Sequence, residues 1–111
     1  MQMKFKPETK LFGVRPELTV AMIVAQSIAQ EKGISLLFSS VAERDPVHST
    51  TSLHYAGCAF DISKHSFPGG FNQMGDFATE LQSRLPKHEF DVIVESASHI
   101  HVEFQPKMLT W

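Results

Sequence analysis

The stretch His99-Ile100-His101-Val102-Glu103-Phe104 alternates polar and apolar residues along its whole length. In a β-strand, successive side chains point to opposite faces of the sheet, so residues two apart share a face. The pattern predicts a strand over residues 99–104 whose apolar side chains turn toward a core. The two histidines and the glutamate share the other face, which we expect to be either a solvated hairpin surface or a binding surface.

The neighbouring segments predict three more strands. Residues 90–94 are mostly apolar and are joined to the opening stretch by the short segment 95–98, which predicts a hairpin. Residues 58–62 and 34–39 also have the length and composition of strands.

Two further segments carry apolar residues at helical spacing. The first begins at Pro16 and Glu17, because a proline and a negative charge suit a helix N-terminus, and it ends at Gly33. The second begins at Phe71 and stops at Pro86. The order helix, strand, loop, strand, helix, hairpin predicts an α+β fold with a small, mostly antiparallel sheet and two main helices.

Length and composition narrow the class of protein. The 111 residues fit a single domain, 1–111. A net charge of −2 without a cluster of Lys and Arg argues against nucleic acid as a partner. The longest apolar stretch, residues 18–25, is too short to span a membrane, and the N-terminus lacks a signal-peptide pattern, so we expect a protein made in the cytoplasm. The single cysteine, Cys58, excludes an internal disulfide and a zinc site of several thiolates.

A second polar group precedes and enters the predicted strand at 58–62. Residues 41–54 are polar and predict a long loop, and a long loop in a small domain is usually functional. Asp61 lies among apolar strand residues, where a carboxylate is costly unless it is paired or bound to a metal. Gly57 permits a tight entry into the strand, which would fold His54 back over Asp61.

Together these residues indicate a metal site. Two histidines and one aspartate from two strands make a three-ligand set of nitrogen and oxygen donors, and catalytic zinc sites hold the metal with three protein ligands. The same set suits a non-haem Fe(II) centre, and side-chain chemistry does not separate the two metals. The plain alternative is a solvated hairpin face, with Asp61 as a cap and His54 as a loop residue.

The motif Ser-x-His-Tyr-x-Gly-x-Ala-Phe-Asp-Ile over residues 52–62, followed by the opening stretch, resembles the LAS-type zinc metallopeptidases. These are the zinc D-Ala-D-Ala carboxypeptidases and the phage L-alanyl-D-glutamate endopeptidases, which share the Hedgehog/DD-peptidase fold. The likeness extends over residues 11–107 and is strongest to short phage or prophage members. It implies one Zn²⁺ per chain held by His54, Asp61 and His101, and peptidoglycan stem peptides as the substrate.

The sequence departs from the family at the position of the general base. The family carries Asp or Glu three residues before the last ligand, whereas this chain has Ser98 there. We expect Glu95 to take that role, carried toward the metal by a bulge in the residues that follow it. His99 is then a proton donor or a stabiliser of the oxyanion. Of the loop residues, the resemblance assigns substrate binding to Arg44 and His48; a solvated loop charge is the alternative for Arg44.

These expectations leave three classes of function. The first is a zinc peptidase acting on stem peptides, as a carboxypeptidase or an endopeptidase. The second is a catalytically weak or inactive metal-containing module that binds peptidoglycan or a protein, which the serine at position 98 favours. The third is an iron oxygenase, which the short chain disfavours. A peptidase without an export signal would reach the cell wall after release from the cell or as part of a virion. We expect a monomer, with no membrane span.

Overall fold

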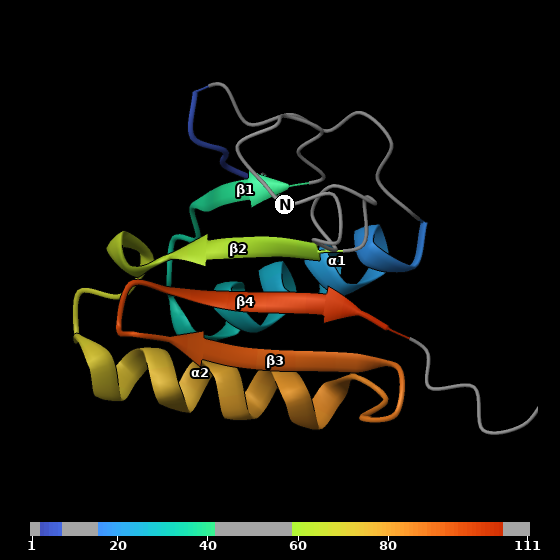
Figure 1. The fold of residues 1–111 in the computed structure, drawn as a ribbon. Coiled ribbons are helices and arrows are strands. Elements are labelled where there is room, and N and C mark those ends of the chain that lie inside the picture. The colour runs from blue at the N-terminus through green and yellow to red at the C-terminus, as the bar shows by residue number, and fades with distance from the viewer. Residues whose placement is uncertain (1–2, 8–15, 42–58, 106–111) are drawn as a thin grey trace, which may run out of the picture.

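The computed structural model describes residues 3–7, 16–41 and 59–105. In these residues the chain forms two helices and one four-stranded antiparallel sheet, which confirms the predicted α+β class (Figure 1). In chain order the elements are α1 (Pro16–Lys32), β1 (Phe38–Val41), β2 (Ala59–Ser63), a short 3₁₀ turn η1 (Lys64–Ser66), α2 (Phe71–Arg84), β3 (Phe90–Glu95) and β4 (His99–Phe104). None of the helices described is long and apolar enough to cross a membrane.

The order of strands across the sheet is β1-β2-β4-β3. The last strand of the described residues, β4, therefore lies in the interior of the sheet, between β2 and β3, and all three pairings are antiparallel. This arrangement places the alternating stretch of β4 beside the strand that carries Asp61.

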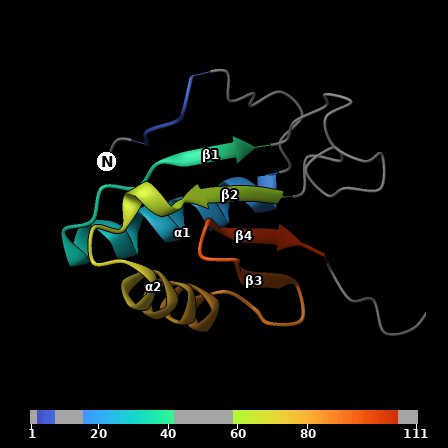
Figure 2. The same cartoon turned by 60° about the vertical axis from the view of Figure 1, so that its left-hand side comes forward.

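Both helices lie on the same side of the sheet, as Figures 1 and 2 show. The apolar face of the central strands packs against them, and Phe60, Ile62, Ile100 and Val102 are each 0% exposed. Because side chains alternate along a strand, the polar residues of β2 and β4 point to the opposite face, away from the helices. The sequence pattern of β4 therefore correctly predicts which residues enter the core.

The predicted ends of the first helix are confirmed, but β1 begins later than expected. Gly33 has φ +69°, the left-handed conformation that often ends a helix. The amide of Ile34 donates to the carbonyl of Ala29 at 2.8 Å, so this residue still caps α1. The strand predicted over residues 34–39 therefore starts only at Phe38.

The turn that joins β3 to β4 has no bulge, which corrects the expectation stated for it. Pairing continues in regular register to Glu95 opposite His99, and the Ser98 amide donates to the Glu95 carbonyl at 2.9 Å. The two turn residues, Ser96 and Ala97, have φ of 51° and 58°. Such tight hairpin turns favour Asn and Gly, so Ser and Ala hold strained backbone next to the polar face.

Because the central strands pack against the helices, shortening a buried side chain of these strands should lower the stability of the fold. Phe60→Ala removes a ring that is 0% exposed, and we expect a loss of about 3–5 kcal/mol in the free energy of unfolding. Phe71→Ala, at a side chain that is 59% exposed, is the matched control and should change it by about 0.5 kcal/mol or less. Urea denaturation of both variants measures the difference; equal losses would contradict this description of the core.

Candidate metal centre

Strand pairing brings Asp61 and His101 together. The two residues are direct partners in the β2–β4 register, forty positions apart in sequence. The Nδ1 atom of His101 lies 2.9 Å from Oδ1 of Asp61, and their side chains are only 13% and 14% exposed. The sequence predicted both as metal ligands, and their side chains meet on the face that the helices leave uncovered.

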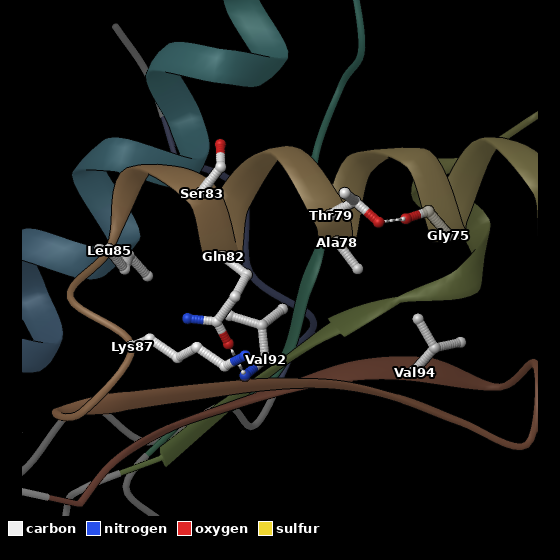
Figure 3. Close-up of a pocket in the computed structure, with 9 residues that line it drawn as sticks. All are labelled: Gly75, Ala78, Thr79, Gln82, Ser83, Leu85, Lys87, Val92 and Val94. Carbon is white, nitrogen blue, oxygen red and sulfur yellow. Dashed lines mark hydrogen bonds between the residues drawn. The ribbon is translucent and has the colours of Figure 1, made fainter.

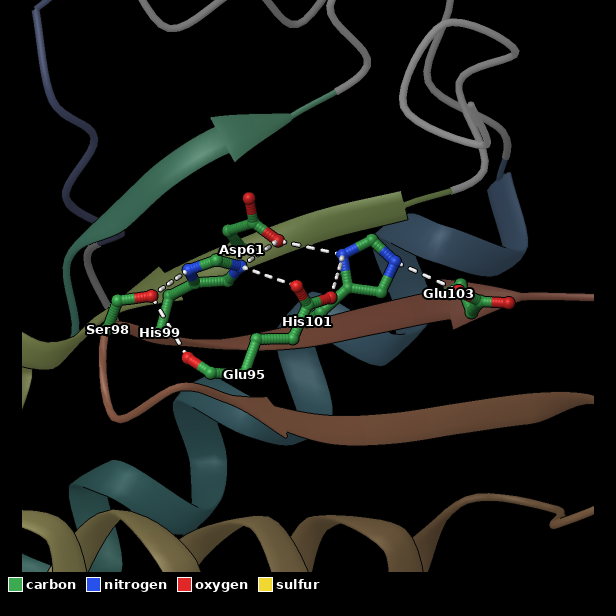
Figure 4. A network of polar contacts seen from close by, with 6 residues as sticks. All are labelled: Asp61, Glu95, Ser98, His99, His101 and Glu103. Atoms are coloured by element: carbon green, nitrogen blue, oxygen red, sulfur yellow. Dashed lines mark hydrogen bonds and ion pairs between the residues drawn. The ribbon is translucent and has the colours of Figure 1, made fainter. Parts of the chain in front are cut away.

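His99 joins this pair from the same strand face. Its Nε2 atom lies 3.7 Å from Oδ1 of Asp61, with the side chain 28% exposed. One donor atom from each of Asp61, His99 and His101 lies within 4.8 Å of the others, close enough for all three to hold one metal ion (Figure 4). The sequence analysis gave His99 a catalytic role and did not count it as a ligand.

Glu95 reaches the same point from β3. Its carboxylate lies 3.7 Å from Nε2 of His99 and 3.9 Å from Nδ1 of His101. The regular pairing of Glu95 with His99 brings it there, so no bulge is required. With its side chain 45% exposed, Glu95 is the most accessible acidic group of this cluster.

The outer nitrogen of each histidine is also hydrogen-bonded. Nε2 of His101 lies 2.9 Å from Oε1 of Glu103, and a carboxylate that is ionised can only accept, so this nitrogen donates. Nδ1 of His99 lies 2.8 Å from the hydroxyl of Ser98. Metal-binding histidines in proteins are held in this way by a partner on the second ring nitrogen.

The two carboxylates beside His101, those of Asp61 and Glu103, favour a positive charge at this residue. Burial lowers the pKa of His101, but the hydrogen bond and charge of Asp61, followed by those of Glu103, outweigh it and raise the pKa above the usual 6.5. A proton on Nδ1 and a metal ion at Nδ1 exclude each other, because a histidine ligand must be neutral. Metal binding at Nδ1 of a protonated His101 would therefore release a proton.

The donor set fits a zinc ion. Tetrahedral zinc with ligand distances of about 2.0–2.2 Å separates neighbouring donor atoms by about 3.3–3.5 Å. In this set the donor atoms of His101 and Asp61 lie 2.9 Å apart and those of His99 and Asp61 lie 3.7 Å apart, on both sides of that value, and all three lie within 4.8 Å of one another. Small side-chain shifts would bring these donors to ligand distance.

The other predicted site residues lie outside the described residues. His54, Arg44 and His48 all fall within residues 42–58. Their predicted roles, as the third metal ligand and as two substrate contacts, stay predictions. The sequence leaves two interpretations of Glu103, support for the metal site or a surface charge, and it does not predict Ser98 as a partner of His99. The alternation that placed Glu103 on the histidine face was the available signal for it.

A groove on the helix side of the sheet is separate from this centre. It has a volume of about 730 Å³ and runs between α2 and β3, with Val92 and Val94 on its floor (Figure 3). Gln82 crosses from α2 to β3 in this groove, where its side-chain oxygen accepts a hydrogen bond from the Val92 amide at 3.0 Å. Since Val92 and Val94 alternate with Ile93 and Glu95 along β3, the groove and the metal-binding group lie on opposite faces.

No protein-family model matches the chain, and no curated protein matches it. The structure itself defines a small α+β domain that carries an Asp/His/His group able to bind a metal ion.

Proposed function

We propose that this protein is a zinc-dependent peptidase that hydrolyses peptidoglycan stem peptides. One observation carries the proposal: the donor atoms of Asp61, His99 and His101 converge on one point of the sheet face opposite the helices. The carboxylate of Glu95 lies beside the same point, 3.7 Å from Nε2 of His99 and 3.9 Å from Nδ1 of His101. The kind of substrate rests on the resemblance of the two sequence motifs to the LAS-type metallopeptidases.

In this proposal Asp61 and His101 hold the zinc ion, and the resemblance adds His54 as the third ligand. Zinc supplies a Lewis acid and lowers the pKa of water to about 7, so that hydroxide is available at neutral pH. The protein fixes the orientation of the His101 ligand, because Glu103 hydrogen-bonds the far nitrogen of the ring at 2.9 Å.

We assign Glu95 as the group that accepts the proton of the attacking water. Its side chain is 45% exposed, which leaves it open to solvent and to substrate, and it lies within 4 Å of both histidine rings. Ser98 cannot replace it, because a hydroxyl does not accept a proton at neutral pH. A carboxylate at this edge of the cluster can pass the proton on to the leaving amine.

The resemblance assigns substrate binding to Arg44 and His48. An arginine binds a carboxylate with two parallel hydrogen bonds, and stem peptides carry carboxylates. We expect Arg44→Lys to raise KM for a stem peptide about tenfold or more while zinc content is unchanged, because lysine lacks the bidentate fork.

Arg84→Lys is the control for this variant. Arg84 bonds Glu31 and Glu80 at the surface, away from the sheet face that carries the histidines. Steady-state kinetics on a defined stem peptide measure both variants. Unchanged kinetics in Arg44→Lys would remove this residue from the substrate site.

A second candidate function is a metal-containing binding module on the same fold. The observation that favours it is Ser98, whose hydroxyl is engaged by His99 and by the Glu95 carbonyl where the peptidase family carries an acid. Such a module would bind peptidoglycan or a protein without cleaving it.

Incubation with defined stem peptides separates the two candidates. Mass spectrometry should detect cleavage products with the zinc-loaded protein and none after treatment with a chelator. The position of the cut distinguishes a carboxypeptidase from an endopeptidase. Binding to purified peptidoglycan without any product would contradict the peptidase proposal and support the module.

A further inference from the structure

We propose that the side-chain amide of Gln82 takes the place of a neighbouring strand at the free edge of β3, and that it thereby prevents this edge from pairing with β3 of a second copy of the chain. In the described sheet, β3 is the last strand on one side and pairs with β4 only. An edge strand exposes main-chain groups that can pair with another chain. This role is independent of the metal-binding group, which lies on the opposite face of the sheet.

The sequence of β3 favours pairing with an identical strand. Val92, Ile93 and Val94 are three consecutive β-branched residues, the type of side chain most favourable in a strand. Ile93 is 43% exposed on the face away from the helices. Asp91 and Glu95 flank this run, and such flanking charges oppose association without occupying any main-chain group. A second copy of β3 therefore finds a matching apolar run wherever the main-chain groups of the edge are open.

The register of the hairpin fixes which main-chain groups of β3 face outward. In an antiparallel pair, opposed residues alternate between those that exchange hydrogen bonds and those that do not. The Gln105 amide donates to the Glu89 carbonyl at 2.7 Å, which places the odd-numbered residues of β3 in the bonded positions toward β4. The amides and carbonyls of Phe90, Val92 and Val94 therefore point away from β4, toward the free edge.

The first part of this edge is already bonded within the chain. The Phe90 amide donates to the Pro86 carbonyl at 2.9 Å. Nε2 of Gln82 donates to the Phe90 carbonyl at 3.2 Å, and Oε1 of Gln82 accepts from the Val92 amide at 3.0 Å (Figure 3). A carboxamide carries the donor and the acceptor of a peptide group, so Gln82 bonds β3 as one residue of an adjacent strand would. Among the described residues, the Val92 carbonyl and both groups of Val94 remain as the open part of the edge.

The fold holds Gln82 in this position. The residue lies in the last turn of α2, directly after the fully buried Leu81, and its carbonyl accepts from the Leu85 amide at 3.2 Å. Lys87 lines the same groove, and a lysine at a sheet edge opposes pairing because its charge must stay in water. A strand that paired along the whole of β3 would have to break both hydrogen bonds of Gln82 and displace Lys87.

Replacing Gln82 by methionine tests this role. Methionine has a side chain of similar length that adapts to the groove, and it offers no hydrogen-bond donor. We expect Gln82→Met to form a dimer in sedimentation-velocity runs at concentrations where the wild type stays monomeric. Gln82→Ala, which removes the side chain beyond Cβ, should do the same. In dilute, monomeric protein, hydrogen exchange of the Val92 amide should be on the order of tenfold faster in both variants, the effect of losing one hydrogen bond.

Val94→Pro identifies the edge at which the copies meet. The Val94 amide points away from β4, so proline removes no hydrogen bond of the sheet but blocks a strand that pairs from outside. Gln82→Met combined with Val94→Pro should return to the monomer. Thr79→Ala is the matched control: Thr79 lines the same groove about one turn earlier on α2, but its hydroxyl donates to the Gly75 carbonyl at 3.0 Å, within the helix. This variant should stay monomeric.

Circular dichroism of each variant verifies that the fold is retained. If folded Gln82→Met and Gln82→Ala stay monomeric at every concentration, or exchange the Val92 amide at the wild-type rate, Gln82 does not protect this edge. Association that survives Val94→Pro would place the contact elsewhere on the protein and contradict the proposal. A wild type that dimerises and becomes monomeric with Val94→Pro would contradict it too, because β3 would then pair despite Gln82.

Discussion

Glu95→Gln is expected to abolish hydrolysis of stem peptides while the protein keeps its zinc. The carboxylate lies 3.7 Å and 3.9 Å from the two histidine nitrogens that face Asp61, close enough to exchange a proton with a water held there. Glutamine has nearly the same shape but cannot accept the proton. General base assistance contributes on the order of 10²- to 10⁴-fold in rate, so turnover should fall by that amount.

The control for this prediction is Asp76→Asn. Asp76 is exposed on α2, on the helix side of the sheet, and its carboxylate has no part in the proposed chemistry. Its variant should cleave stem peptides at the wild-type rate. Turnover by Glu95→Gln equal to that of the control would show that another group accepts the proton.

Asp61→Ala and His101→Ala are expected to lose both the metal and the stabilisation that the metal provides. A ligand that binds only the folded state stabilises it by about 2.7 kcal/mol at 100 times its Kd. The wild type should therefore show a clear rise in Tm when zinc is added, and the two variants should show none. His65→Ala and His88→Ala replace exposed histidines and should respond to zinc as the wild type does.

The interpretation requires that each variant is folded. Comparing Tm values in the presence of a chelator isolates the effect of the substitution from the effect of the metal. A wild-type rise in Tm that persists in Asp61→Ala would place the zinc elsewhere in the chain and contradict the proposed centre.

Much of the fold follows from local patterns in the sequence. The alternation in β4 correctly predicts its core residues because a strand with one buried face has a strict period of two. The ends of α1 are correct because Pro16 and Gly33 are local signals that act without tertiary contacts. The start of β1 is not, because the Ile34 amide caps α1 and pairing with β2 begins only at Phe38.

The candidate site could be predicted only in part. Asp61 and His101 were paired from their chemistry and from a family resemblance, but their contact depends on the strand order β1-β2-β4-β3, which no local pattern encodes. The approach of Glu95 to the histidines follows from the register of the β3–β4 hairpin and not from the expected bulge. The hydrogen bond from His99 to Ser98 joins neighbours in sequence, yet only the turn geometry reveals it.

The measurement that tests the central claim most directly is the metal content of the purified protein. The wild type is loaded with Zn²⁺, freed of excess ion by gel filtration and examined by elemental analysis beside Asp61→Ala and His101→Ala. A centre built on Asp61 and His101 predicts about one zinc ion per chain in the wild type and close to none in the two variants. Wild-type protein without stoichiometric metal after loading, or variants that retain it, would contradict the account.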